Sequence, residues 1–332
     1  MRFMRPRWSS TAPSALGTPV SVGTPVSGTP ASVPGTTPLY GAGFDGEQPL
    51  VVANPPGSEP TALWRYDGSN WSQLLTAAFV GNPSRTRTGS AVLVNQPAGG
   101  SDQFHFVRIV NGNITHTPVT QAGTVLGEQS DGSLLVGEGR TVWRLAPGAA
   151  DFEVFSTDPQ LADWNGAVLD DDRLLNLTKT GLVLFDKAGT RLSTIACGAL
   201  LCAKDALGVG VVGGQPHIVF GSPLDEAYVI TRVDLTAGSL VTVGRVPTAL
   251  ELEGVTFAAI VAQLAVTEGR WFAVRVEDYA SSEGWLVYNS IDGQGSPAVV
   301  TKKFTLGGGL FTTPGAVWAY EPQKRTFSRM PR

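Results

Sequence analysis

The chain has 332 residues and a net charge of −4, so no excess of positive charge draws it to nucleic acid. Its longest apolar run, residues 255–266, is much shorter than the about 20 residues of a membrane-spanning helix, which argues against membrane insertion. With 40 glycines and 23 prolines, the composition favours many short strands joined by turns over long helices.

Residues 1–38 have the composition of a disordered tail. The opening stretch "MRFMRPRWSS" carries the arginines of a signal-peptide start, but no apolar segment follows it. Next comes a tract rich in threonine, proline and glycine, with the triplet Gly-Thr-Pro beginning at residues 17, 23 and 28. Such a tract has too little apolar side chain to offset the entropy of ordering it, and proline keeps it extended. We expect a tether to a cell envelope or another domain, or alternatively a tail with no role.

From residue 39 onward a unit of strand, turn and strand recurs. Seven hairpins share this pattern, and aligning them places one residue of each at the same position: Trp64, Val107, Trp143, Val183, Thr231, Leu286 and Trp318. The mean spacing of about 42 residues matches a four-stranded propeller blade. A further apolar strand precedes each hairpin, and small-residue segments such as "LYGAGF" and "LGVGVVGG" precede several of those.

This pattern predicts an all-β protein, a seven-bladed β-propeller of four-stranded antiparallel blades spanning residues 39–332 as one domain. Residues 64–74 and 318–330 would be the outer hairpins of the first and last blades and would become neighbours when the ring closes. A pair of β-sandwiches or a mixed domain is the alternative. The apolar run 255–266 is expected to be a buried strand pair or a short core helix.

The last repeat, "VWAYEPQKRTFSRMP", resembles the kelch unit, in which a tyrosine–acid–proline turn leads to an aromatic residue and a closing Met-Pro. The segment "WRYDGSNWSQL" and the pair Gly213-Gly214 are similar to parts of the same unit. The resemblance implies a kelch-like bacterial propeller at the level of the fold and implies no activity.

Sequence signals for catalysis, cofactors or metals are weak. The three histidines, His105, His116 and His217, are scattered and are expected to be ordinary strand or surface residues. There is no Gly-x-Ser-x-Gly elbow and no phosphate-binding loop, so we expect no cofactor. The run Asp170 to Arg173 could suggest a divalent cation site, but a solvated turn between two strands is the preferred interpretation, and no metal is expected.

Cys197 and Cys202 are the only cysteines of the chain. They are interpreted either as two small buried residues or as a local disulfide. A disulfide would imply an oxidising compartment.

The loops between the second and third strands are long in blades one, two, five and six, and loops on a rigid scaffold often bind partners. They carry six carboxylates and one aromatic residue: Glu59, Asp102, Asp225, Glu226, Asp278, Glu283 and Tyr279. Arg85 and Arg87 are assigned to the connection between blades one and two, on the same face. We therefore expect an acidic arc, interrupted by this arginine pair, that suits a basic partner surface. Alternatively, the acidic loops only keep the protein soluble.

These features favour a non-catalytic binding or scaffold propeller that takes a protein or glycan ligand on one loop face, as a monomer or within a larger assembly. We expect it outside the cell or at the cell envelope; an internal scaffold in the cytoplasm would gain if the two thiols were free. The alternative function is a propeller enzyme, a lyase or glycosidase using carboxylates and arginine. Two acids and an arginine converging at the mouth of the central channel would favour the enzyme.

Overall fold

The computed structural model describes the backbone of most of the repeat region. The described residues are 26–27, 39–40, 43–53, 61–96 except 82, 103–158 except 121 and 150, 166–197 except 179–180, 206–222 except 213, 227–266 except 248, 253, 254 and 259, 271–278, 283–290, 298–299, 304–305, 309–321 except 315, and 326–330. Beyond residue 242, side chains are described only at Thr313, Pro314 and Trp318. Within these ranges every regular element is a strand, which confirms the all-β expectation. The same part of the chain contains no helix with the length and apolar character needed to span a bilayer.

The first four sheets follow one another along the chain, and within each the strands pair antiparallel. The first sheet contains β2 (Leu39–Tyr40), β3 (Phe44–Asp45), β4 (Gln48–Ala53), β5 (Thr61–Tyr66) and β6 (Trp71–Ala77). The second contains β7 (Phe79–Val80), β8 (Ser84–Arg85), β9 (Ser90–Asn95), β10 (Phe104–Val110) and β11 (Asn113–Val119). The third contains β12 (Thr124–Glu128), β13 (Leu134–Glu138), β14 (Thr141–Leu145) and β15 (Glu153–Ser156). The fourth contains β16 (Gly166–Val168), β17 (Leu174–Leu177), β18 (Gly181–Phe185) and β19 (Arg191–Ala196).

The C-terminal half continues the series and adds one small hairpin. The fifth sheet contains β20 (Ala206–Val212), β21 (Gln215–Ser222), β22 (Ala227–Asp234) and β23 (Ser239–Pro247). A two-stranded sheet of β24 (Ala249–Leu252) and β25 (Val255–Ala258) follows. The sixth sheet contains β26 (Ile260–Val266), β27 (Trp271–Asp278), β28 (Glu283–Ser290), β29 (Ala298–Val299) and β30 (Phe304–Thr305). The last sheet contains β31 (Gly309–Thr313), β32 (Ala316–Glu321), β33 (Thr326–Met330) and, from the other end of the chain, β1 (Val26–Ser27).

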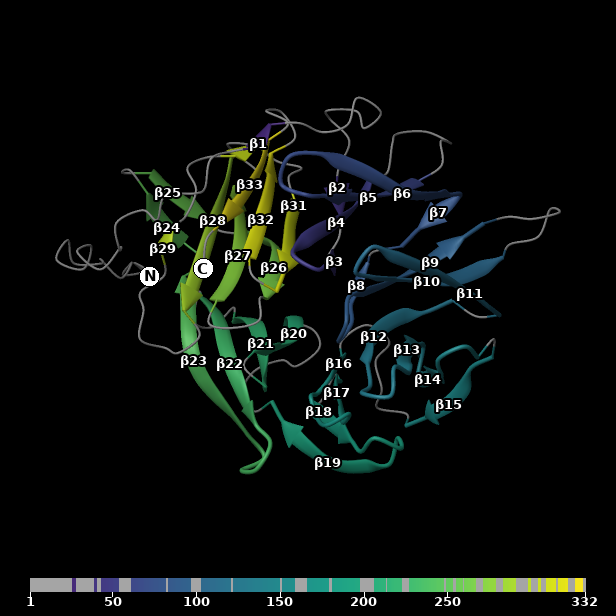
Figure 1. Cartoon of the computed structure of the whole chain (residues 1–332). Helices are drawn as coiled ribbons and strands as arrows, with labels where there is room; N and C mark the ends of the chain where they lie inside the picture. The colour runs from purple at the N-terminus through teal and green to yellow at the C-terminus, as the bar shows by residue number, and fades with distance from the viewer. Residues whose placement is uncertain are drawn as a thin grey trace.

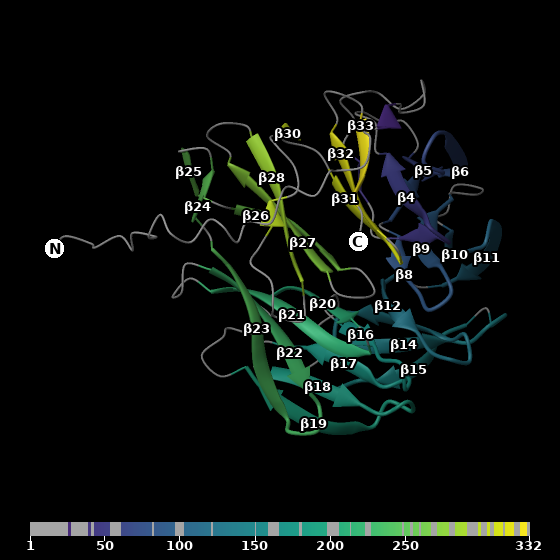
Figure 2. The ribbon, with the colours of Figure 1, turned by 60° about the vertical axis from the view of Figure 1, so that its left-hand side comes forward.

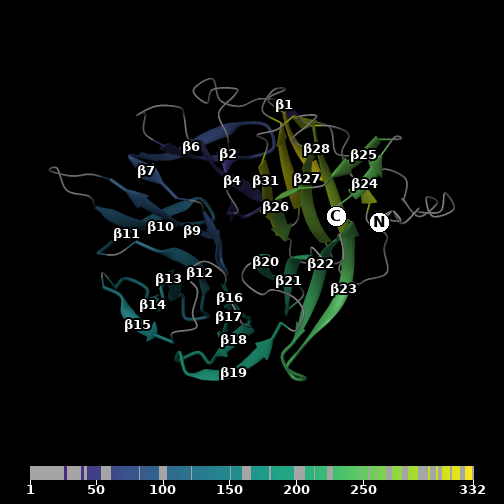
Figure 3. The same ribbon diagram turned by 180° about the vertical axis from the view of Figure 1, so that it is seen from behind.

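The sheets stand around a central axis in chain order, as Figures 1 and 3 show from opposite sides. Their innermost strands contact one another in turn: β8 with β12, β12 with β16, β16 with β20, β20 with β26, and β26 with β31. β31 then contacts β4 of the first sheet, so the series closes on itself. Figure 2 shows the last sheet beside the first at this closure. This is the arrangement of a β-propeller, in which each sheet covers both of its faces with its neighbours.

The hydrophobic core lies between the sheets and explains the unbroken apolar runs of the strands. Side chains of β4 alternate between its two faces: Leu50 and Val52 pack with the second sheet, whereas Val51 and Ala53 pack in a cluster with Trp318 of the last sheet. A strand buried on both faces needs apolar residues at successive positions. The junctions with described side chains from the second sheet to the fifth are similar, as at Phe106 between the second and third sheets.

The last sheet differs from the sequence-based expectation in one respect. Trp318 lies in β32, the second strand of its sheet, whereas Trp64 lies in β5, an outer strand of its own, so 318–330 is not an outer hairpin. The outermost position is taken by β1, whose Val26 and Ser27 pair with Phe327 and Thr326 of β33. Two residues of the expected tail are therefore part of a sheet. The expected proximity is confirmed, because the rings of Tyr66 and Trp318 lie 5.8 Å apart in a T-shaped contact.

The apolar run 255–266 forms strands β25 and β26, and the helical alternative is wrong. The two strands do not pair with each other, because β25 pairs with β24 and β26 pairs with β27.

Candidate functional site at the axial turns

The acidic loops predicted to bind a partner lie mostly outside the described residues. Glu59, Asp102, Asp225, Glu226 and Tyr279 fall in the gaps, while Asp278 and Glu283 are register partners where β27 ends and β28 begins. All of these residues follow a second strand or precede a third strand of their sheets. Because the sheets are antiparallel and stand in one ring, the ends of their second strands and the starts of their third strands lie on one face of the propeller. We call this face the loop face.

Arg85 and Arg87 are on the opposite face, which corrects the expectation that they interrupt the acidic arc. Arg85 ends β8 and pairs with Ser90, the first residue of β9, so the two strands are joined by a tight turn that contains Arg87. The loop with Asp102 leaves β9 at its other end, after Asn95. The arginines therefore belong to an axial turn, our term for the turns that join the innermost strand of a sheet to its second strand.

Arg87 connects axial turns of two sheets. Its Nη2 donates to the carbonyl oxygens of Leu169 at 3.3 Å and Asp170 at 3.2 Å and to the carboxylate of Asp172 at 3.0 Å. These three residues belong to the turn between β16 and β17, in the fourth sheet. The guanidinium thus extends past the third sheet near the axis of the ring.

The third sheet joins this contact through Ser130. Its backbone N–H donates to Oδ1 of Asp172 at 2.6 Å, and its hydroxyl donates to Oδ2 of the same carboxylate. Gln129, which is buried, donates from Nε2 to the carbonyl oxygens of Asp172 and Lys187. Asp172 itself has a left-handed backbone with φ of 68°, which an aspartate tolerates better than most residues.

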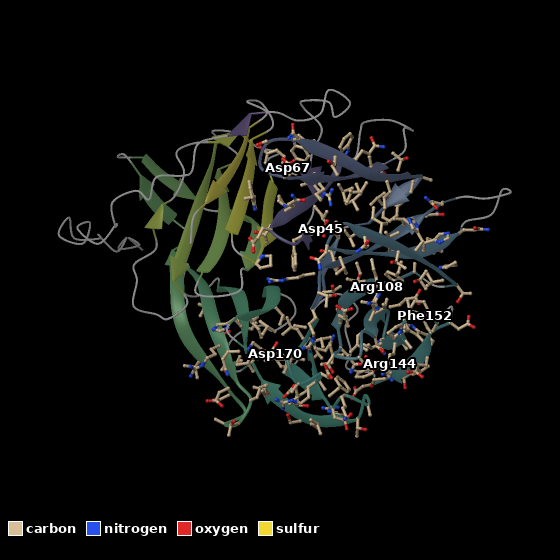
Figure 4. The ribbon with its side chains drawn as sticks, in the orientation of Figure 1. Asp45, Asp67, Arg108, Arg144, Phe152 and Asp170 are labelled. Carbon is tan, nitrogen blue, oxygen red and sulfur yellow. The ribbon has the colours of Figure 1, made fainter. Side chains whose placement is uncertain are left out.

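Two further carboxylates hold neighbouring sheets together. Glu128 of the third sheet accepts from Nη1 of Arg108 in the second sheet at 2.6 Å and from Thr88 of the second sheet's axial turn. Asp45 of the first sheet accepts from Arg65 at 2.7 Å and from the backbone N–H of Gly112 in the second sheet. In Figure 4, Asp45, Arg108 and Asp170 come from different sheets around the ring.

Sequence reasoning missed these ion pairs because it considered charged residues only in loops and turns and assigned no role to Asp45, Arg108 or Glu128. A signal was present: an acid ends the inner strand in "GFD" and "LGE", at Asp45 and Glu128.

Four described aspartates have a pKa below the ordinary value. Backbone N–H groups of Asn70 and Ser69 lower the pKa of Asp67, and those of Thr190 and Ala188 lower that of Asp186. The N–H of Ser133, with the Arg144 guanidinium, lowers the pKa of Asp131; the Arg173 side chain lowers that of Asp171. These groups stay ionised at neutral pH and serve as anions and hydrogen-bond acceptors rather than as proton donors.

The turn from Asp170 to Arg173 lies between β16 and β17, as expected for a solvated turn. Asp171 pairs with Arg173, and Asp172 pairs with Arg87. Among the described residues, no three histidine, cysteine or carboxylate side chains gather as a set of metal ligands.

Arg87 and Asp170 keep polar groups that the described part of the protein does not use. Arg87 makes its hydrogen bonds through Nη2 alone, and its side chain is 35% exposed. Asp170 contributes only its backbone carbonyl, and its carboxylate lies close to Gly214 of the fifth sheet's axial turn. Of the two acids, Asp172 meets the guanidinium with its carboxylate and Asp170 with its backbone carbonyl oxygen, so the expected convergence of two carboxylates and an arginine is present only in part.

His105 and His116 lie on adjacent strands with ring centroids 6.2 Å apart, and His217 is buried. Burial lowers the pKa of His217, with a further contribution from the positive charge of Arg232. Burial also raises the pKa of Tyr66 to about 12.

Cys197 follows β19, is buried between the fourth and fifth sheets and is disulfide-bonded. Cys202, the other cysteine, lies outside the described residues.

Comparison with solved structures shows the fold. Virginiamycin B lyase from Staphylococcus aureus superposes with a TM-score of 0.56 at 9% identity, over 93% of this chain and 98% of that one. YCF48 bound to D1 peptide gives 0.54 at 11% identity over 93% and 95%. The β-propeller domain of Cps50 (Swd1) from Myceliophteria thermophila gives 0.54 at 11% identity over 88% and 96%. No protein-family model matches the chain, and no curated protein does. At these identities the likeness supports the β-propeller fold and nothing about activity.

Proposed function

We propose that the protein is a non-catalytic binding or scaffold propeller with seven four-stranded blades. The observation that carries this proposal is the state of the carboxylates on the axial-turn side. Asp45, Glu128 and Asp172 join neighbouring sheets, and the four shifted aspartates are held ionised. Charges used in this way make a rigid frame, which suits the presentation of loops. The kelch-like assignment belongs to this proposal and rests on the sequence resemblance.

The ligand would be a protein or glycan with a basic surface that meets the loop face. Its contacts would be the six loop carboxylates and Tyr279, because arginine and lysine pair with carboxylates. The protein would act as a monomer or within a larger assembly, outside the cell or at the envelope, with the N-terminal segment as tether. A propeller that holds a peptide has a precedent among the structural neighbours, since YCF48 is seen with the D1 peptide bound.

The test is binding of a fluorescent lysine-rich peptide, followed by anisotropy at low and at physiological salt. Replacing all six loop carboxylates by their amides is expected to abolish binding, and the triple replacement Asp225→Asn, Glu226→Gln and Asp278→Asn to weaken it at least tenfold. The matched control is Asp151→Asn, Glu153→Gln and Asp170→Asn, the same charge change on the opposite face. Equal affinity of the sixfold variant and the wild type would overturn the acidic loop face.

An enzyme is the second candidate, because Arg87 contacts the Asp172 carboxylate and the backbone of Asp170 at the axial turns. A lyase or glycosidase would use the guanidinium to bind an acidic sugar and the open Asp170 carboxylate to move a proton. The test is product release from a panel of acidic polysaccharides, with Asp170→Asn as the inactive variant and Asp151→Asn as its control. Turnover that survives Asp170→Asn would remove these turns as the catalytic site.

A further inference from the structure

The hairpin turn between β10 and β11 contains a chemically labile pair of residues. Val110 and Asn113 are register partners, so Asn111 and Gly112 alone form the loop, and both are exposed. Their φ angles of 50° and 80° are left-handed, as in a type I′ turn, for which Asn-Gly is a preferred sequence. Asn-Gly is also the sequence in which an asparagine side chain loses ammonia most readily, because glycine leaves the next backbone nitrogen unhindered.

This loss of ammonia, deamidation, begins at the backbone nitrogen of Gly112. The nitrogen gives up its proton and attacks Cγ of Asn111. A C–N bond forms, the Cγ–Nδ2 bond breaks, and Nδ2 leaves as ammonia with the proton. Water then opens the cyclic imide at either of its carbonyl carbons, which gives aspartate or isoaspartate at residue 111. Water is the co-reactant, and nothing is oxidised or reduced.

Asp45 of the first sheet holds the reacting nitrogen. The Gly112 N–H donates to Oδ1 at 2.9 Å and to Oδ2 at 3.0 Å of this carboxylate, whose side chain is 3% exposed. The Arg65 guanidinium fixes the same carboxylate at 2.7 Å. A carboxylate is too weak a base to remove an amide proton, and its negative charge opposes formation of an amide anion beside it. The Gly112 nitrogen is therefore unreactive while it is bonded to Asp45.

The geometry of the turn acts in the same direction. To close the imide ring, the peptide plane between Asn111 and Gly112 must rotate out of its orientation in the turn and bring the nitrogen to the asparagine side chain. That rotation breaks both hydrogen bonds to Asp45. The reaction thus requires a local opening between the first and second sheets.

We propose that Asn111 is a deamidation site that the Asp45 contact protects: it reacts only in molecules whose first and second sheets have parted there, and its product prevents the contact from re-forming. Isoaspartate lengthens the backbone of the two-residue turn by one carbon atom, which displaces the Gly112 N–H. Either product also adds a negative charge at the residue before Gly112, which a buried carboxylate holds. The modification converts a reversible opening into a permanent one. This inference does not depend on the proposed function.

Peptide mass spectrometry tests the proposal, because deamidation replaces NH2 by OH at an identified residue. Purified protein is incubated at mildly alkaline pH, folded or in concentrated urea, and the conversion of Asn111 is followed with time. A hydrogen bond to a charged group favours the bonded state by about tenfold to a hundredfold, and the folded wild type is expected to react more slowly than the unfolded chain by that factor. Asn165-Gly166, the other Asn-Gly pair of the sequence, is the reference in urea, where both pairs should react at similar rates.

Asp45→Ala removes the contact and is expected to raise the rate at Asn111 in the folded protein by about tenfold. Asp186→Ala is the matched control: this carboxylate likewise accepts backbone N–H groups in a turn, but in the fourth sheet, so the rate at Asn111 should stay unchanged. If Asp45→Ala does not fold because Arg65 is left without its partner, the double variant with Arg65→Met removes both charges and repeats the test.

Hydrogen exchange of the Gly112 amide supplies a readout on the unaltered protein. Exchange also requires this N–H to leave Asp45, so below the unfolding transition in urea both exchange and deamidation should accelerate in parallel. Protein converted at Asn111 in urea and then refolded should exchange the Gly112 amide without protection.

Equal deamidation of Asn111 in the folded and unfolded wild type overturns the proposal, and so does a rate that Asp45→Ala leaves unaltered or that Asp186→Ala raises as much. A protected Gly112 amide in the converted and refolded protein overturns the permanent opening.

Discussion

Glu128 and Asp45 each hold a carboxylate almost out of contact with water at the junction of two sheets. Their side chains are 4% and 3% exposed, and each accepts hydrogen bonds from an arginine and from a backbone N–H. A buried charge is tolerated only when it is paired and hydrogen-bonded. Removing one member of the pair leaves the other charge buried without its partner, which strongly destabilises the fold.

Glu128→Gln is therefore expected to lower the free energy of unfolding by about 3 kcal/mol, since the Arg108 guanidinium loses its carboxylate partner while still partly buried and keeps only the carbonyl oxygen of Gly132 among the described contacts. Chemical denaturation at neutral pH measures the change. Glu153→Gln is the matched control: its carboxylate is 61% exposed and pairs with Arg144 at the surface, where about 0–1 kcal/mol is expected. Similar decreases in the free energy of unfolding in both variants would show that the buried pair stabilises the protein no more than the surface pair.

His217 gives the fold a dependence on mildly acidic pH. It is 3% exposed, its Nδ1 lies 2.8 Å from the carbonyl oxygen of Gln215, and burial lowers its pKa below 6.5. The unfolded chain then binds the proton more readily than the folded one. The stabilisation is complete above the unfolded pKa and is lost as the pH falls below it.

The melting temperature of the wild type is expected to fall between about pH 7.5 and about pH 5, and this fall should shrink in His217→Gln. Thermal unfolding followed by circular dichroism across that range checks the difference. His116→Gln, which replaces an exposed histidine, should keep the wild-type slope. An unchanged slope in His217→Gln would place the pH dependence elsewhere.

At the scale of the strands, close approach between sheets is decided at single glycines. Gly189 lies in the turn between β18 and β19 with φ of 89°, and a Cβ there would overlap the carbonyl oxygen of Phe155 in β15. Gly148 also has a left-handed backbone, with φ of 74°, but has open space around it. The two positions share the conformational requirement and differ only in contact.

Gly148→Ala is expected to cost about 1–2 kcal/mol, the penalty for a left-handed alanine. Gly189→Ala is expected to cost at least twice that, because the third and fourth sheets must also move apart. Denaturant midpoints of the two variants give the comparison. A cost at Gly189 no greater than at Gly148 would mean that the turn shifts freely away from β15.

The strands that could be predicted from the sequence are those with continuous apolar runs, such as β4. Burial on both faces requires apolar residues at successive positions, and this pattern is visible in the sequence. The innermost strand of the second sheet was not recognised, since β7 and β8 have two residues each and show no periodicity. Arg85 and Arg87 were consequently assigned to the wrong face. The position of β32 was also missed, because the fourth strand of its sheet comes from the opposite end of the chain, which no local pattern records.

At the scale of the whole molecule, stability depends on contacts between the first and last sheets. Trp318 packs there with Trp64 and Tyr66, β31 contacts β4, and the hydroxyl of Thr313 donates to Glu47 at 3.3 Å. Because each sheet of a propeller buries its faces against its neighbours, opening the ring at one junction exposes two faces at once. Loss of the contacts between the first and last sheets should therefore also reduce the stability of sheets far from this junction.

Trp318→Ala tests this coupling. Trp318 is 5% exposed, and removing the indole is expected to cost about 3–5 kcal/mol. If the ring unfolds as one unit, hydrogen exchange of the β18 amides, in the fourth sheet, should accelerate by the same free energy as exchange in β32. Phe79→Ala, at a side chain that is 52% exposed, is the control and should leave both nearly unchanged. Faster exchange in β32 with unaltered exchange in β18 would show that the sheets open independently.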